Sequence, residues 1–316
     1  MNASPSQNSE RGQVLAIFAL ALVAIIAMTG LVLDGGSTFV QRRDMQNVAD
    51  AAAMAAAYDY ANTGLASSAV AAAKAAAVAN GYVEGTDGVA VDVVVDEGAV
   101  ATTIEVSVGK PHQNSFSGIV GMPEWDVSTT ATSIAGPANS AIGAAPIIFN
   151  EDAFNPNNTP QTDDQWYNEP GTGTDDVPEG AGEFNWTVYC TASGNECNGD
   201  SNDVSELITG TNESGSTITL GDTDIGPLNA GAHANLFSDL AALVGECFPV
   251  SIVADDGTFV GISMFCLTGS VGGETKSISG YFLTSYQGDV GWQMRINPNS
   301  APGTSVFGAT AVYLVN

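Results

Sequence analysis

The most prominent pattern in the chain is an uninterrupted apolar run near its N-terminus. Val14 to Leu33 holds twenty residues without an ionisable side chain, between Arg11 and Asp34. As a helix rising 1.5 Å per residue, it is about 30 Å long, which matches the hydrocarbon thickness of a bilayer. A cleaved signal peptide is the alternative, but signal cores run to about 7–15 residues and no A-x-A-like site follows here. The pattern predicts a transmembrane helix over 14–33 after a tail over 1–13.

Strong helix formers dominate the segment beyond the apolar run. Helix is expected to resume near Ser37 and to continue to about Tyr60. Asn62-Thr63-Gly64 predicts a break, followed by a second alanine-rich helix over 65–79 that ends at Asn80-Gly81.

The second half of the first helix carries almost no large side chains. Small residues allow another helix to approach closely, as they do in membrane helix pairs. One interpretation is a contact face for a helix of a second protein; the alternative is packing within the same domain. The candidate contact residues are Ala52, Ala53, Ala56 and Ala57.

The hydrophobic pattern then changes to a period of two residues. Segments 89–95 and 102–108 predict paired strands, joined by a turn at Asp96-Glu97-Gly98. Segment 116–122 predicts a short helical turn, and 125–134 a third strand. Residues 34–136 are therefore expected to form a helical stalk with a small α+β module.

Composition separates this module from a second one. Residues 137–183 are predicted to be a flexible linker followed by an acidic loop rich in Pro and Gly. Residues 184–316 are predicted to be a mainly β domain containing one amphipathic helix over 234–244. Its strand candidates are 184–190, 216–220, 249–253, 259–267, 277–284 and 305–315. The expected fold class is thus α+β throughout.

Charge limits the possible partners. The chain has seven Lys and Arg against 35 Asp and Glu, for a formal charge of −28, and most acids lie beyond residue 80. Nucleic acid is not an expected partner, because binding phosphates requires clustered bases. A solvated acidic surface is the simplest interpretation.

The cysteines bear on the compartment of the second module. Their even number predicts two disulfides and an oxidising environment. Sequence proximity favours Cys190–Cys197 and Cys247–Cys266, among three possible connectivities. Arg42 and Arg43 follow the span and only Arg11 precedes it, so the positive-inside rule alone would place the C-terminal side in the cytoplasm. The cysteines and the strand-rich distal region favour a cytoplasmic N-terminus and an extracytoplasmic C-terminal domain.

Two segments resemble a known family. Arg11-Gly12-Gln13 before the span, and Gln41-Arg42-Arg43 running into Asn47-Val48-Ala49-Asp50-Ala51-Ala52-Ala53, resemble the N-terminal region of TadE/TadG-like proteins of the Flp, or tight-adherence, pilus assembly system. The resemblance covers about 11–136. It implies a membrane-anchored accessory or minor component without enzymatic activity. Implied partners are the lipid bilayer, TadE-like minor pilins, the pilin and the inner-membrane platform.

Two departures refine this resemblance. Processed pilins of this kind carry a Glu five residues after Gly, whereas Ile17 follows Gly12 at that spacing. An amino terminus made by cleavage would lack its carboxylate partner in an apolar setting, so a TadG-like, uncleaved chain is expected. Asp126-Val127-Ser128-Thr129-Thr130 fits the D-x-S-x-T metal motif of some relatives only superficially, because it falls inside an alternating strand.

Catalytic motifs are missing from the sequence, and no enzyme and no cofactor are expected. His112 is expected on a loop surface and His233 at a surface or capping position. The acidic pairs lack EF-hand spacing, which favours solvated turns over calcium sites. They are Asp163-Asp164, Asp175-Asp176 and Asp255-Asp256. A Ca²⁺-dependent surface adhesin using a similar anchor is the alternative function.

Overall fold

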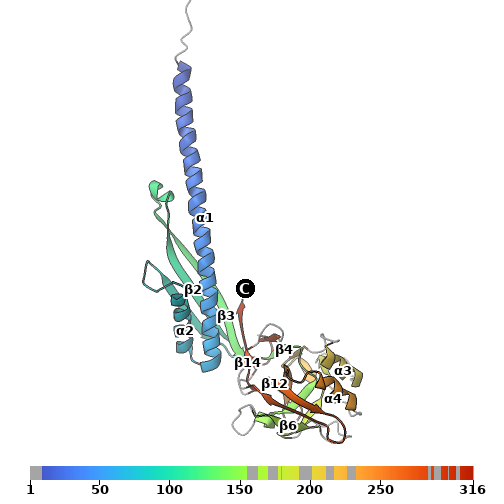
Figure 1. Ribbon diagram of the computed structural model, residues 1–316. Coiled ribbons are helices and arrows are strands. Elements are labelled where there is room, and N and C mark those ends of the chain that lie inside the picture. The colour runs from blue at the N-terminus through green and yellow to red at the C-terminus, as the bar shows by residue number, and fades with distance from the viewer. Residues whose placement is uncertain are drawn as a thin grey trace, which may run out of the picture.

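A single helix connects the apolar segment to the folded body. The computed structural model describes residues 9–154, 163–169, 177–178, 180–191, 201–210, 217–225, 233–283, 286–287, 293–297, 299–303 and 307–315. The helix α1 (Ser9–Thr63) is 55 residues long and unbroken. Its first part projects from the body and its second part lies against it (Figure 1). The expected interruption between residues 33 and 37 is wrong. Gly35 and Gly36 stay helical, although each costs about 1 kcal/mol relative to Ala.

The proximal module packs two helices against an antiparallel sheet. Beside α1 it contains α2 (Ala66–Ala79), β1 (Ala90–Glu97), β2 (Thr102–Gln113) and β3 (Glu124–Pro137). The three strands pair in chain order, and the 3-10 helix η1 (Ser117–Val120) forms the tip of the β2–β3 hairpin. These elements confirm the strands, the second helix and the helical turn expected from the sequence, and the α+β class.

The candidate contact alanines lie inside this module. Ala52, Ala53, Ala56 and Ala57 are fully buried. They share a cluster with Ala69, Ala73 and Ala77 of α2 and with branched side chains of the sheet. The Ser133 hydroxyl of β3 donates a hydrogen bond to the Ala53 carbonyl at 2.8 Å. A partner's helix cannot reach these positions, so that interpretation is corrected. The alternative, packing within the same domain, describes the structure.

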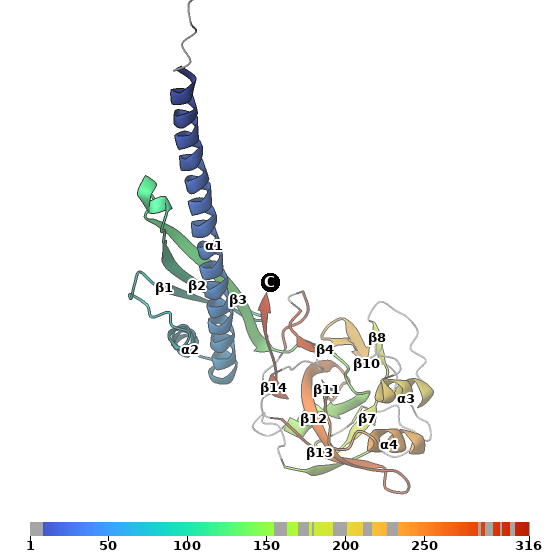
Figure 2. The ribbon, with the colours of Figure 1, turned by 45° about the horizontal axis from the view of Figure 1, so that its top comes forward.

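The C-terminal strand belongs to the proximal sheet and not to the distal domain. β16 (Ala309–Val315) pairs antiparallel with β3, placing Val312 opposite Ala135. β14 (Tyr286–Gln287) pairs in parallel with β16, so the sheet order is β1-β2-β3-β16-β14. Figure 2 shows the C-terminal end lying beside β3. The expected distal domain of 184–316 is therefore wrong at its C-terminal end.

The distal module is built around a six-stranded sheet of mixed direction. In spatial order its strands are β6 (Gln165–Asn168), β13 (Ser277–Phe282), β12 (Phe259–Val271), β11 (Cys247–Val253), β5 (Ile147–Asn150) and β7 (Phe184–Trp186). Two small sheets accompany it. They contain β4 (Ser140–Ile142), β9 (Ile218–Thr219) and β15 (Gln293–Arg295), and β8 (Tyr189–Thr191) with β10 (Thr223–Ile225).

The segment expected to be a linker is part of this module. β4, β5 and β6 all fall within 137–183, and every residue of β5 is buried. The 3-10 helix η2 (Glu151–Phe154) follows β5 and buries Phe154. The small residues before β5 and the acids after it suggested a linker, because their composition does not reveal that Ile147-Ile148-Phe149 is an internal strand of the sheet. The expected boundaries at 137 and 183 are thus also wrong.

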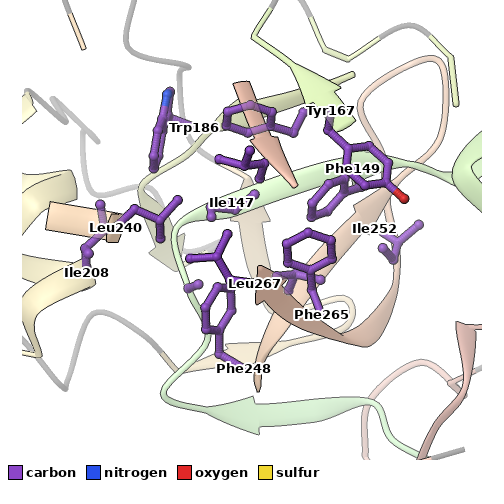
Figure 3. Close-up of a cluster of buried hydrophobic side chains, with 14 of the residues drawn as sticks. Ile147, Phe149, Tyr167, Trp186, Ile208, Leu240, Phe248, Ile252, Phe265 and Leu267 are labelled. Carbon is purple, nitrogen blue, oxygen red and sulfur yellow. The ribbon is translucent and has the colours of Figure 1, made fainter. Parts of the chain in front are cut away.

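Aromatic side chains fill the core between the six-stranded sheet and its two helices. The helices are α3 (Ser201–Thr209) and α4 (Ala234–Ala241). Phe149 lies at the centre, with its ring centroid 4.9 Å from Phe265 and 5.0 Å from Tyr167. Figure 3 shows Ile208 and Leu240 on the helices and Phe149 and Phe265 on the strands of the sheet. Such rings each bury a large apolar area, so this module has a substantial core of its own.

One disulfide crosses two neighbouring strands of this sheet. Cys247 and Cys266 stand opposite each other in the β11–β12 register and are bonded. Their sequence separation of 19 residues corresponds to a stabilisation of about 3 kcal/mol in the chain-entropy model. The other expected pair, Cys190 and Cys197, lies outside the described residues because Cys197 is not among them.

Candidate membrane anchor and its hairpin

The apolar segment has nothing packed on it over most of its length. From Val14 to Leu33 the large side chains are exposed on all sides of α1, with Leu20 at 72%. Its most apolar window has a mean hydropathy of 2.8, and it is the one such helix in the part of the chain that the structure describes. A helix that is apolar all round and uncovered requires an apolar solvent. These features indicate a single-pass membrane anchor.

Asp34, the first residue after the apolar segment, is buried at 2% exposure. Its carboxylate accepts hydrogen bonds from three successive backbone N–H groups at the tip of the β2–β3 hairpin. The distances are 2.9 Å from Ser115, 3.0 Å from Phe116 and 2.6 Å from Ser117. A carboxylate facing consecutive amides at the start of a helical turn satisfies donors that would otherwise be unpaired. Asp34 therefore fixes the hairpin tip to α1.

The pKa of Asp34 reflects two opposing effects. Burial alone would raise the pKa of this carboxyl, but the hydrogen bonds from Ser117, Ser115 and Phe116 lower it below its ordinary value. Asp34 is consequently ionised at neutral pH, and its negative charge is held by the amides of the hairpin.

Glycine is required one turn nearer the N-terminus. Gly30 is buried against Phe116, and a Cβ added at Gly30 would lie 2.5 Å from the Cβ of Phe116. A side chain there would displace the hairpin tip. Gly30 belongs to the apolar segment, so the hairpin reaches back along α1 to the level of that segment.

Further polar contacts continue along the same side of α1. The two ring nitrogens of His112 lie 3.0 Å from Ser37 Oγ and 2.6 Å from Gln41 Oε1. Gln41 Nε2 also donates to the carbonyl of Lys110 at 2.9 Å. Positions 30, 34, 37 and 41 follow the spacing of one helix face. His112 was expected on a loop surface, but it ends strand β2 and packs on α1.

The comparisons with known proteins concern this helix. Residues 12–59 match the Tad family model, described as Flp pilus-assembly TadE/G-like. This TadE/G-like segment confirms the resemblance found in the sequence over those residues. It includes the anchor, Asp34 and the buried alanines, and it leaves most of the chain outside the match. No curated protein and no solved structure matches the chain.

Three acids of the pairs considered in the sequence accept hydrogen bonds within the distal module. Asp255 Oδ1 accepts a hydrogen bond from Asn150, and Asp256 Oδ1 accepts one from the Thr258 backbone in the turn between β11 and β12. Asp164 accepts one from Thr268. Asp175 and Asp176 lie outside the described residues. Within those residues no group of three or more His, Cys, Asp or Glu could hold a metal ion.

A buried ionisable cluster in the distal module was not anticipated. His233 contacts the Glu169 carboxylate through Nδ1, and Lys276 Nζ lies 3.3 Å from the other carboxylate oxygen. The side chains of His233 and Glu169 are both almost fully buried. His233 occupies the N-cap position of α4, as one of the two expectations had it, but its side chain makes no capping bond. The other expectation, a surface position, is wrong because His233 is buried. The cluster joins segments far apart in sequence, and no local pattern could have revealed it.

Proposed function

We propose that this protein is a membrane-anchored, non-enzymatic structural or accessory component of a Flp/Tad-type pilus assembly system that acts in surface adhesion. The observation that carries the proposal is the TadE/G-like match over 12–59, which covers the anchor and the part of α1 docked in the proximal module. The continuous helix joins the bilayer to the folded body without a flexible linker. This arrangement suits a component that holds its outer modules at a fixed position above the membrane.

The proposed location is the cell membrane, with the N-terminus in the cytoplasm and the two folded modules outside. The Cys247–Cys266 disulfide supports this side, because such bonds persist in oxidising compartments. Arg42 and Arg43 follow the span and would favour the opposite orientation by charge alone. Protease added to spheroplasts should digest the distal module; full protection from protease would contradict the orientation.

The proposed partners are the lipid bilayer, TadE-like minor pilins, the pilin and the inner-membrane platform. Deleting the gene in the native host should reduce surface pili and adhesion, and the full-length chain should restore both. Cross-linking in membranes should recover pilus proteins with the wild-type chain. A control chain carrying an unrelated transmembrane helix in place of 14–33 separates general anchoring from specific assembly. Normal piliation in the deletion strain, with no pilus protein recovered, would contradict the proposed function.

A further inference from the structure

The tip of the β2–β3 hairpin carries exposed apolar side chains. Ile119 is 82% exposed, and Phe116 and Met122 are also exposed. The tip is fixed to α1 by the Asp34 carboxylate, so these side chains have a defined position and are not on a free loop. The chain has a formal charge of −28, so an exposed apolar cluster at the end of a hairpin stands out from the rest of its surface. Such a cluster indicates a site that contacts an apolar environment.

The depth of this tip relative to the bilayer follows from its contacts. Phe116 packs on Gly30, which lies inside the apolar segment, and Asp34 holds the next residues one turn further out. Figure 1 shows the hairpin tip beside the projecting part of α1. If the helix spans the bilayer over 14–33, the tip is already at the level where hydrocarbon meets headgroups. The bilayer itself can therefore bury the apolar side chains of the hairpin tip.

The surface of α1 changes from apolar to basic beyond the tip. Phe39 and Val40 are exposed, and the exposed Arg42 and Arg43 follow after Gln41. Lys110 lies at the same level, because its carbonyl accepts a hydrogen bond from Gln41. Arg42 lies about 18 Å along the helix from Gly30. Its long side chain reaches back toward the lipid phosphates, which shortens the distance to the charged group. Arg42 and Arg43 form no ion pair with a described residue, whereas the Lys110 ammonium lies 5.8 Å from the centroid of the Tyr82 ring.

We propose that the β2–β3 hairpin tip is a second membrane contact, with Phe116, Ile119 and Met122 inserted at the headgroup–acyl boundary of the leaflet where α1 leaves the bilayer. Arg42 and Arg43 face the phospholipid headgroups of the same leaflet. Half-buried Trp125, opposite His112 in the hairpin, lies between the two groups, where aromatic side chains are typical of membrane interfaces. The exposed acids Glu124 and Asp126 lie at the tip end of β3, close to the inserted side chains, so insertion depth tests the proposal better than salt dependence. Anchor and hairpin together set the tilt of the proximal module on the membrane.

The test measures the depth of the tip in the full-length chain in phosphatidylcholine vesicles. Ile119→Cys is labelled with a small fluorophore, and intact mass verifies one label per chain. Val94→Cys is the matched control: it is an apolar position, 59% exposed, on β1. Val94 stands opposite Glu105, about 27 Å along β2 from its tip end. Lipids brominated on the acyl chains should quench the label at 119 at least threefold more than the label at 94, and aqueous iodide should show the reverse order.

Equal quenching at the two positions would overturn the proposal. So would a label at 119 that iodide reaches and bromine does not, the result expected if a partner protein covers the tip in the cell. Vesicle flotation distinguishes failure of the anchor from failure of the inference: a chain that floats while its tip stays aqueous refutes only the hairpin contact. The pilus role is not used in the proposal, and neither quenching result depends on it.

Discussion

The four buried alanines show how the size of single residues sets the distance between elements. Ala52, Ala53, Ala56 and Ala57 share one cluster with alanines of α2, with branched side chains of β2 and with alanines of β3. Small side chains on α1, α2 and β3 let these elements approach closely, and the branched side chains of β2 fill the remaining space. An alanine-rich helix face is equally suitable for contact with a partner protein and for packing within its own domain. Only the burial of these residues distinguishes the two.

Replacing Ala53 with Leu should destabilise the proximal module by about 1–3 kcal/mol, because added methylenes overpack a filled core. Ala51→Leu is the matched control, since Ala51 is exposed on the same turn and both residues are strong helix formers. Chemical unfolding of the detergent-solubilised chain measures the difference. Equal stability of the two variants would contradict the packing described here.

Asp34→Ala should release the hairpin tip from α1. The amides of Ser115, Phe116 and Ser117 lose their shared acceptor, and their hydrogen exchange should accelerate at least tenfold, with Asp96→Ala as an exposed control. Because the pKa of Asp34 is lowered in the folded state, its stabilising contribution is complete above about pH 4 and declines as the pH falls through the depressed value. The alanine variant should lack this acid dependence. Unchanged protection in Asp34→Ala would show that the tip is held by other contacts.

At the scale of elements, strand β16 brings the C-terminal part of the chain back to the proximal sheet. It covers the edge of β3 and returns the chain from the distal module to the sheet that packs on α1. The two modules are therefore joined twice, once through β3 into β4 and once through the C-terminal strand. Two connections restrict relative motion more than a single linker does.

Ending the chain after Gly308 should expose the edge of β3 and loosen the joint between the modules. Hydrogen exchange at the amides of Thr132–Gly136 that face β16 should increase at least tenfold, while the β1–β2 pairing keeps its protection. Removal of Asn316 alone serves as the control. If the truncated chain kept full protection along β3, the strand would contribute no stability to the sheet.

The whole molecule presents one apolar projection followed by two modules that carry most of its acidic residues. Gly30 and Asp34 are in contact with the hairpin, so the anchor is structurally continuous with the proximal module. Cleavage beyond the anchor would cut a helix that is part of the folded body. Cleavage after Gly12 would leave a new amino terminus without an acid at the Ile17 position.

The chain should therefore remain uncleaved and membrane-bound in cells. Intact-mass measurement of protein purified from membranes should give the full-length value, and carbonate washing should not release it. An Ile17→Glu variant tests whether a carboxylate at this position is enough to permit processing. A mature terminus at Gln13 in the wild-type chain, or release into the soluble fraction, would refute this prediction.

The sequence by itself determined the features that arise from local chemistry. Twenty uncharged residues require an apolar solvent, and alternating residues make β1, β2 and β3. Proximity in sequence favoured the Cys247–Cys266 disulfide among three connectivities, and the strand register decided it. The TadE/G-like segment is likewise a local pattern. Tertiary structure decided what depends on distant partners: the buried alanines, the role of Asp34, the place of β16 and the burial of His233 by Glu169. In each of these cases the partner lies on a different element of the fold, and neither periodicity nor composition encodes which elements meet.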